Sequence, residues 1–256
     1  MIKVKIDDRE IEVEEHSTVL EAAERLGIYI PTLCAHRTLA PYGACRLCMV
    51  ELREGDWSKL VTACTYPVED GLEVHTGSEK VIEARRFVIE LLLARCPNSE
   101  EIRMLARRLG VENTRFESAD EDRKCILCGL CVRVCREVIG SAAISFIHRG
   151  LERAVETPFQ IQSDACIGCG ACAFVCPTGA IRIEDIEEIR KLETWHTELE
   201  LVKCRQCGAT IGTVEVINRL KEELDLPAEV LDHCTRCRRK ILGRELCVNK
   251  LAPFGR

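Results

Sequence analysis

The sequence predicts an α+β protein made of several small domains, most of them folded around cysteine-bound metal. Three observations support this fold class. Eighteen of the 256 residues are cysteines, and sixteen of them stand at metal-ligand spacings. Short N-terminal runs alternate apolar and charged residues as β-strands do, and helical apolar stripes separate the cysteine-rich segments. Aromatic residues make up only 4% of the chain, so the cores are expected to be small and aliphatic.

Residues 1–77 predict a β-grasp domain. Apolar and charged residues alternate on both sides of Asp7–Glu10, which indicates an opening hairpin. A helix is expected after Thr18, because Glu21 completes a capping box and a helical apolar stripe follows. Strand, strand and helix is the order in which a β-grasp domain opens. Two further strand-like runs follow at residues 50–53 and 60–63.

Four cysteines of this domain have the spacing C-x10-C-x2-C-x15-C, and they are Cys34, Cys45, Cys48 and Cys64. Three thiolates on one loop and a fourth from a later strand predict a [2Fe–2S] cluster. A closed zinc site uses the same residue type and is the alternative. His36 lies two residues after Cys34, but with four cysteines at hand we expect it to be a neighbour of the cluster and not a ligand.

Residues 78–114 predict a helical linker. Ser78 and Ser99 each precede an apolar-periodic run, so each is expected to cap a helix. The segment contains no histidine and the single cysteine Cys96, so no metal site is expected in it. We expect Cys96 to be a small buried apolar residue.

Residues 115–190 carry the same motif twice. The pattern C-x2-C-x2-C-x3-C begins at Cys125 and again at Cys166. In two-cluster ferredoxins of bacterial type, the fourth cysteine of each run binds the other cluster. The segment therefore predicts a 2[4Fe–4S] ferredoxin domain, and zinc, which binds paired cysteines, fits eight cysteines in two runs poorly. The first cluster is assigned to Cys125, Cys128, Cys131 and Cys176, and the second to Cys135, Cys166, Cys169 and Cys172.

Two further features accompany the repeat. Alternation at residues 143–148 and 153–157 predicts a hairpin between the two runs. Arg136 follows the first run where Pro177 follows the second. A cation that points toward a cluster favours its reduced form and so raises its potential.

Residues 191–256 predict a metal-binding tail. A charged helical stretch is expected after Lys191, and two C-x2-C knuckles follow, which are Cys204 with Cys207 and Cys234 with Cys237. Paired knuckles favour a zinc-ribbon-like site that holds one Zn²⁺. A further iron–sulfur cluster with the same four ligands is the alternative, because ligand type alone does not separate the two.

The sequence also makes predictions for the tail residues outside the two knuckles. The apolar spacing of residues 214–224 predicts an amphipathic helix between the knuckles. His233 can replace a cysteine ligand only if one of the four is spare, and Cys247 is expected to be structural. The basic run 236–240 is either a solvated face or a docking patch for an acidic partner.

One stretch resembles a known family. The sequence IPTLCAHRTLAPYGACRLCMVEL from Ile30, followed by TACTYPVEDGLEVHTGS from Thr62, resembles the N-terminal ferredoxin part of the large iron–sulfur subunit of respiratory complex I. It is similar to iron-only hydrogenases, NAD-dependent formate dehydrogenases and the diaphorase small subunit of NAD-linked, bidirectional or electron-bifurcating hydrogenases. The resemblance covers residues 2–185. In that family the linker often carries a further cluster bound by one histidine and three cysteines, and this chain lacks those ligands.

The cluster sites and the resemblance together imply a non-catalytic electron-transfer subunit of a multi-subunit NAD(P)-linked oxidoreductase. The implied partners are a flavin- and NAD(P)-binding iron–sulfur subunit, which the β-grasp domain would face, and a catalytic hydrogenase or formate dehydrogenase subunit. The chain contains no G-x-G-x-x-G after a strand and no Walker loop, so no nucleotide, flavin or catalytic site is expected in it. The alternative is a stand-alone soluble electron carrier, and a redox-sensing zinc-ribbon scaffold is a weaker one.

Charge and hydropathy limit the remaining partners. The net charge of −6 and the scattered Lys and Arg residues argue against nucleic acid. No apolar run approaches the roughly 20 residues of a membrane span. Because the cysteines match metal-ligand spacings and no signal peptide precedes them, we expect a reducing cytoplasm. The subunit role that the resemblance implies makes a hetero-oligomer the expected state.

Overall fold

The computed structural model describes residues 1–55, 57–118, 120–224 and 228–250. The chain divides into two compact units. The first is formed by residues 1–138 and 172–180, and the second by residues 139–171 and 181–256. No helix among the described residues is both long and apolar enough to cross a membrane.

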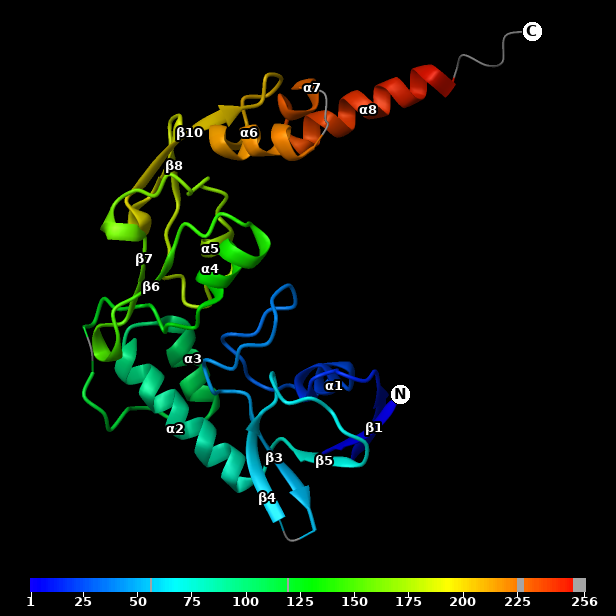
Figure 1. Ribbon diagram of the computed structural model, residues 1–256, viewed down its shortest axis with the longest axis vertical. Coiled ribbons are helices and arrows are strands. Elements are labelled where there is room, and N and C mark those ends of the chain that lie inside the picture. Colours follow the sequence, from blue (N-terminus) through cyan, green and yellow to red (C-terminus); the bar gives the residue numbers. More distant parts are fainter. Residues whose placement is uncertain (56, 119, 225–227, 251–256) are drawn as a thin grey trace. The chain divides into compact units, whose positions relative to one another are not determined.

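The first unit begins with a five-stranded sheet in the order β2-β1-β5-β3-β4 (Figure 1, blue to cyan). Its strands are β1 (Ile2–Ile6), β2 (Arg9–Val13), β3 (Met49–Glu54), β4 (Trp57–Thr62) and β5 (Leu72–His75). The opening hairpin is confirmed, because β1 pairs antiparallel with β2. The parallel pairing of β1 with β5 at the centre of the sheet completes a β-grasp arrangement, and the sequence pattern did not predict β5.

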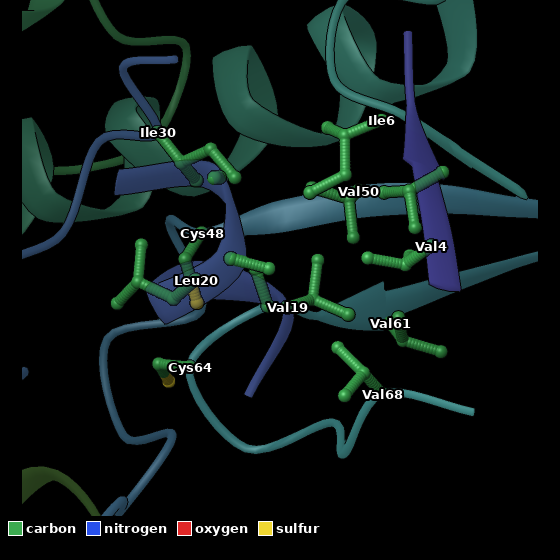
Figure 2. Packing of buried hydrophobic residues seen from close by; sticks show 14 of the residues in the cluster. Val4, Ile6, Val19, Leu20, Ile30, Cys48, Val50, Val61, Cys64 and Val68 are labelled. Atoms are coloured by element: carbon green, nitrogen blue, oxygen red, sulfur yellow. The ribbon is translucent and has the colours of Figure 1, made fainter. Parts of the chain in front are cut away.

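Helix α1 (Val19–Arg25) packs its apolar face into the core of this domain. The predicted capping box is confirmed: the Glu21 carboxylate accepts from the Thr18 amide at 2.7 Å, and Thr18 Oγ1 accepts from the Glu21 amide at 3.2 Å. The core is aliphatic, as the low aromatic content predicts. Figure 2 shows valine, leucine and isoleucine side chains packed together, with Cys48 and Cys64 in the same buried cluster.

Two helices follow the sheet, α2 (Glu79–Arg95) and α3 (Glu100–Arg108). Ser78 and Ser99 are their N-caps, as predicted. Arg85 of α2 is buried and donates from Nε and Nη2 to the Met49 carbonyl at 3.1 and 2.7 Å, which attaches the helix to β3. Cys96 is fully buried, in agreement with its predicted structural place.

The motif from Cys125 leads into the short helix α4 (Leu130–Arg133), which continues as a π-helical turn over Val134–Val138. Gly129 caps α4 with φ +77°, a conformation that a residue with a Cβ rarely adopts. The second motif leads into α5 (Ala171–Phe174).

The second unit contains the predicted hairpin and a sheet that was not predicted. The hairpin is confirmed by antiparallel β6 (Ser145–Ile147) and β7 (Ala154–Glu156). The sheet has the order β11-β10-β9-β8, formed by β8 (Glu184–Ile186), β9 (Ile189–Leu192), β10 (Thr197–Lys203) and β11 (Thr210–Thr213). The charged helical stretch expected after Lys191 is wrong. Its residues TELELVK alternate with period two: Leu199 and Leu201 are buried, and Glu198 and Glu200 are exposed.

The helix expected between the two knuckles is confirmed as α6 (Val214–Glu223), capped by Thr213. Two more helices follow, α7 (Ala228–Leu231) and α8 (Thr235–Lys250). The side chain of Cys247 lies outside the described part of the chain.

Candidate metal centres

The N-terminal quartet lies where the long loop after α1 meets the ends of β3 and β4. Cys34 and Cys45 are on the loop, Cys48 directly precedes β3, and Cys64 follows β4. All four are 9% exposed or less. The Cys45 amide donates to Cys34 Sγ at 3.3 Å, and the Ala63 amide donates to the Cys48 carbonyl at 2.9 Å. The fold therefore gathers the four predicted ligands at one edge of the sheet.

The four cysteine side chains are hydrogen-bonded to one another. Hydrogen bonds from Cys45 and Cys64 lower the pKa of Cys34 to about 2, and a hydrogen bond from Cys64 lowers the pKa of Cys48 to about 7. Hydrogen bonding to these thiolates raises the pKa of Cys45 and Cys64 in turn. A [2Fe–2S] cluster, which binds four thiolates, would replace these hydrogen bonds with metal bonds. His36 Nδ1 contacts Thr38 Oγ1 at 2.8 Å.

The quartet assigned to the first [4Fe–4S] cluster lies entirely within the first unit. Burial raises the pKa of Cys128 to about 12 and also raises that of Cys131, with smaller contributions from neighbouring thiols that include Cys34 for Cys128. Burial disfavours a bare thiolate at these two positions, and bound iron would neutralise the thiolate charge. The Ala180 amide donates to Cys176 Sγ at 3.3 Å, a contact that also fits a sulfur ligand. Arg95 Nε donates to the Cys125 carbonyl at 3.0 Å and holds the start of the motif.

The quartet assigned to the second [4Fe–4S] cluster is divided between the units. Cys135 and Cys172 belong to the first, and Cys166 and Cys169 belong to the second. The ligand set of this cluster therefore stays a prediction from the repeat. Arg136 is mostly exposed and pairs with Glu137 at 3.3 Å, so its guanidinium has a partner other than a cluster.

The loop Cys166–Cys169 is held tightly by the four-stranded sheet of its own unit. Thr213 Oγ1 donates to the Ile167 carbonyl at 2.5 Å, and Arg190 Nη1 donates to the Gly168 carbonyl at 2.9 Å. Gly168 has φ +63°, and a Cβ on it would lie 2.6 Å from Leu199 Cδ1. The left-handed backbone and the close packing both favour glycine at this position.

The two C-terminal knuckles come together. The Sγ atoms of Cys204, Cys207, Cys234 and Cys237 all lie within 4.8 Å of one another, and His233 is not part of this group. Two sulfurs on one zinc ion lie at most about 4.6 Å apart, since each Zn–S bond is about 2.3 Å. In a [4Fe–4S] cluster each thiolate binds its own iron, which separates the sulfurs further. The spacing of this group is compatible with a single bound metal ion.

Backbone groups support the first knuckle. Amides of Cys234, Gln206 and Cys207 donate to Cys204 and lower the pKa of its thiol to about 6, which favours the metal-binding thiolate. The Cys204 amide in turn donates to the Ala209 carbonyl at 2.8 Å. An ion pair between Arg205 and Asp232, at 3.0 Å, joins the two knuckles.

Sequence reasoning missed the basic residues that position these loops. Arg133, Arg190 and Arg95 look like solvated charges in the sequence, yet each donates to a backbone carbonyl of, or next to, a cysteine loop. The available signal is weak: Arg133 lies between Cys131 and Cys135, two predicted ligands of the first motif.

Comparison with known proteins covers both cluster regions. Residues 1–79 match the model of the 2Fe-2S iron-sulfur cluster binding domain. Residues 124–180 and 165–213 match the model of the 4Fe-4S dicluster domain.

Three curated relatives illustrate the similarity. The chain is 37% identical over 233 residues to an NADH-quinone oxidoreductase subunit of Rhizobium meliloti, a match that covers 81% of this chain and 27% of the relative. It is 35% identical to NADPH-Fe(3+) oxidoreductase subunit alpha of Geobacter sulfurreducens, over 71% of this chain and 24% of the relative. It is 33% identical to NADP-reducing hydrogenase subunit HndD of Solidesulfovibrio fructosivorans, over 71% of this chain and 36% of the relative. The chain thus spans between 24% and 36% of the length of these relatives.

A solved structure matches as well. It is a crystal structure of an NAD+-reducing [NiFe]-hydrogenase in the H2-reduced state, with a TM-score of 0.54 and 30% sequence identity. The match covers 61% of this chain and 74% of the hydrogenase chain.

Proposed function

We propose an electron-relay function for this chain, which belongs to the iron–sulfur subunits of NAD(P)-linked hydrogenases and complex I-like oxidoreductases. In this proposal the β-grasp quartet holds one [2Fe–2S] cluster and the repeated motif holds two [4Fe–4S] clusters, with the ligands assigned above. One observation carries the proposal: the N-terminal quartet and the quartet from Cys125 lie within one packed unit. A packed scaffold keeps two redox centres at a fixed separation, which electron tunnelling requires.

The chain's own residues perform the remaining tasks. The N-terminal quartet is buried, as are Cys128 and Cys131 of the repeated motif, which would keep water away from these sulfurs. Backbone amides of Cys45 and Ala180 donate to the sulfurs of Cys34 and Cys176. Hydrogen bonds of this kind stabilise the reduced, more negative cluster. When bound, the clusters would supply one-electron chemistry.

The partners follow from the same proposal. A flavin- and NAD(P)-binding iron–sulfur subunit would exchange electrons with the β-grasp end, and a hydrogenase or formate dehydrogenase subunit would be the catalytic partner. The helices α2 and α3 and the C-terminal tail favour a subunit over a free carrier, because a carrier needs neither. Sixteen cysteines reserved for metal also favour a reducing cytoplasm.

For the C-terminal quartet we propose one Zn²⁺. The sulfur separations fit a single tetrahedral ion, and two C-x2-C knuckles are the usual ligand pattern of structural zinc. A zinc ion is redox-inert, so this site would stabilise the fold and carry no electrons.

Metal analysis and EPR of the reduced, anaerobically purified protein test the proposal. We expect about ten iron atoms and about one zinc per chain, the sum for one [2Fe–2S], two [4Fe–4S] and one zinc site. The Cys45→Ser variant should lose the [2Fe–2S] signal and keep the [4Fe–4S] signals. A wild-type protein without a [2Fe–2S] signal, or with a bound flavin, contradicts the relay assignment.

A further inference from the structure

Arg133 occupies an unusual position in the first cysteine motif. It lies between Cys131 and Cys135 at the end of α4, and it is only 5% exposed. A buried arginine cannot be deprotonated, so its charge must be met by hydrogen-bond acceptors or by other negative groups. The identity of those acceptors indicates what the residue does.

Two of the three partners of Arg133 are far away in the sequence. Its Nη2 donates to the carbonyl of Ala40, and its guanidinium carbon lies 4.9 Å from the centre of the Tyr42 ring. Both residues belong to the loop between Cys34 and Cys45, which are proposed ligands of the [2Fe–2S] cluster. Glu137, one turn further along, pairs with Nε at 3.5 Å.

This geometry uses properties that are specific to arginine. The planar guanidinium bonds with its edge to a carbonyl and stacks with its face on an aromatic ring, and a lysine ammonium cannot do both. Nη1 is buried and has no hydrogen-bond partner among the described residues. The guanidinium therefore binds the loop between Cys34 and Cys45 through both its edge and its face.

We propose that Arg133 is a positioning residue that fixes the loop of the [2Fe–2S] quartet against α4 and so sets the separation between the [2Fe–2S] and the first [4Fe–4S] cluster. The inference rests on the proposed function, because it takes the two quartets as cluster sites. The carbonyl contact orders the loop, and the Tyr42 stack fixes its distance from the helix.

The test compares Arg133→Gln and Arg133→Lys with Arg136→Gln in the cluster-loaded protein. Arg136 is a matched control, because it lies in the same turn and pairs with Glu137 but is mostly exposed. The first readout is hydrogen exchange of the amides of residues 36–45. The second is the spin–spin interaction between the reduced [2Fe–2S] and [4Fe–4S] clusters in EPR, which depends on their separation.

We expect Arg133→Gln to accelerate exchange in the loop by at least about tenfold, the factor that one charge-assisted hydrogen bond supplies. The spin–spin interaction should weaken, Arg133→Lys should behave like Arg133→Gln, and Arg136→Gln should match the wild type. Tyr42→Leu removes only the stack and provides the same comparison if the arginine variants do not fold. Equal exchange and equal spin coupling in the Arg133 variants and Arg136→Gln overturn the inference, as does full rescue by lysine.

A wild-type protein without a [2Fe–2S] signal would refute the proposed function instead. The exchange comparison would still decide whether Arg133 orders the loop. The two failures are therefore distinguishable.

Discussion

Gly168→Ala tests how the sheet of the second unit holds a cluster loop. The glycine has φ +63°, and an added Cβ would lie 2.6 Å from Leu199 Cδ1 and 3.0 Å from Thr213 Cγ2. The left-handed backbone costs a residue with a Cβ about 1–2 kcal/mol, and overpacking a buried site costs about 1–3 kcal/mol. We expect the free energy of unfolding of this unit to fall by about 2–5 kcal/mol.

Gly150→Ala is the matched control for this substitution. Gly150 belongs to the same unit and has φ +57°, but nothing lies within 4 Å of the position of its Cβ. It should lose only the backbone contribution of about 1–2 kcal/mol, so the difference between the two variants measures the steric contact.

The assay is anaerobic urea unfolding followed by the fluorescence of Trp195, which is 2% exposed in the same unit, in a Trp57→Phe background. EPR of the same samples should show a weakened signal of the second [4Fe–4S] cluster in Gly168→Ala alone. Equal losses of stability in the two variants, with intact EPR signals in both, would refute the claim that Leu199 and Thr213 pack on the loop.

Two further predictions concern a buried carboxylate and the tail. Glu51 is 1% exposed, and hydrogen bonds from Ser78, and then from Arg53 and Lys80, lower its pKa to about 2. Because the folded pKa lies below the unfolded one, Glu51 stabilises the β-grasp domain at neutral pH, and this contribution is lost as pH falls from about 5 to 2. Glu51→Gln should lower the free energy of unfolding by about 1–3 kcal/mol at pH 7 and by little at pH 2. Denaturant unfolding at the two pH values measures this, and an equal loss at both contradicts the ionic role. Chelation of the tail metal, or Cys207→Ser, should release one zinc per chain, leave the iron content unchanged and speed hydrogen exchange in α6 and at the start of α8; loss of iron together with an EPR signal would identify a cluster instead.

The cysteine quartets can be assigned from the sequence because their spacing is local, and their assignment to clusters stays a prediction. Three ligands of each ferredoxin motif lie within seven residues, so spacing alone limits which centre can bind. The N-caps at Thr18, Ser78 and Ser99 are equally local, and all three are confirmed. The sequence therefore predicts the role of a residue where that role is determined by its neighbours along the chain.

The remainder depends on contacts between distant residues. Strand β5 finds its place between two distant partners, β1, about 70 residues earlier, and β3. In β10, glutamates alternate with the buried leucines, so that the sequence favours a helix. Three arginines have the same role, because each guanidinium donates to a backbone carbonyl of a distant segment: Arg85, Arg133 and Arg190. Which carbonyl a long side chain reaches is a property of the folded chain, and no spacing in the sequence indicates it.

The position of the C-terminal four-cysteine site within the second unit argues for a structural role. Strand β10 carries Leu199, which packs on Gly168, and ends directly before Cys204. Strand β11 ends at Thr213, whose hydroxyl holds the Ile167 carbonyl. The two strands therefore contact the cluster loop near one end and the metal quartet at the other. A metal ion that fixes the first knuckle would also fix the register of β10 against β11, and thus the surface on which the loop Cys166–Cys169 rests.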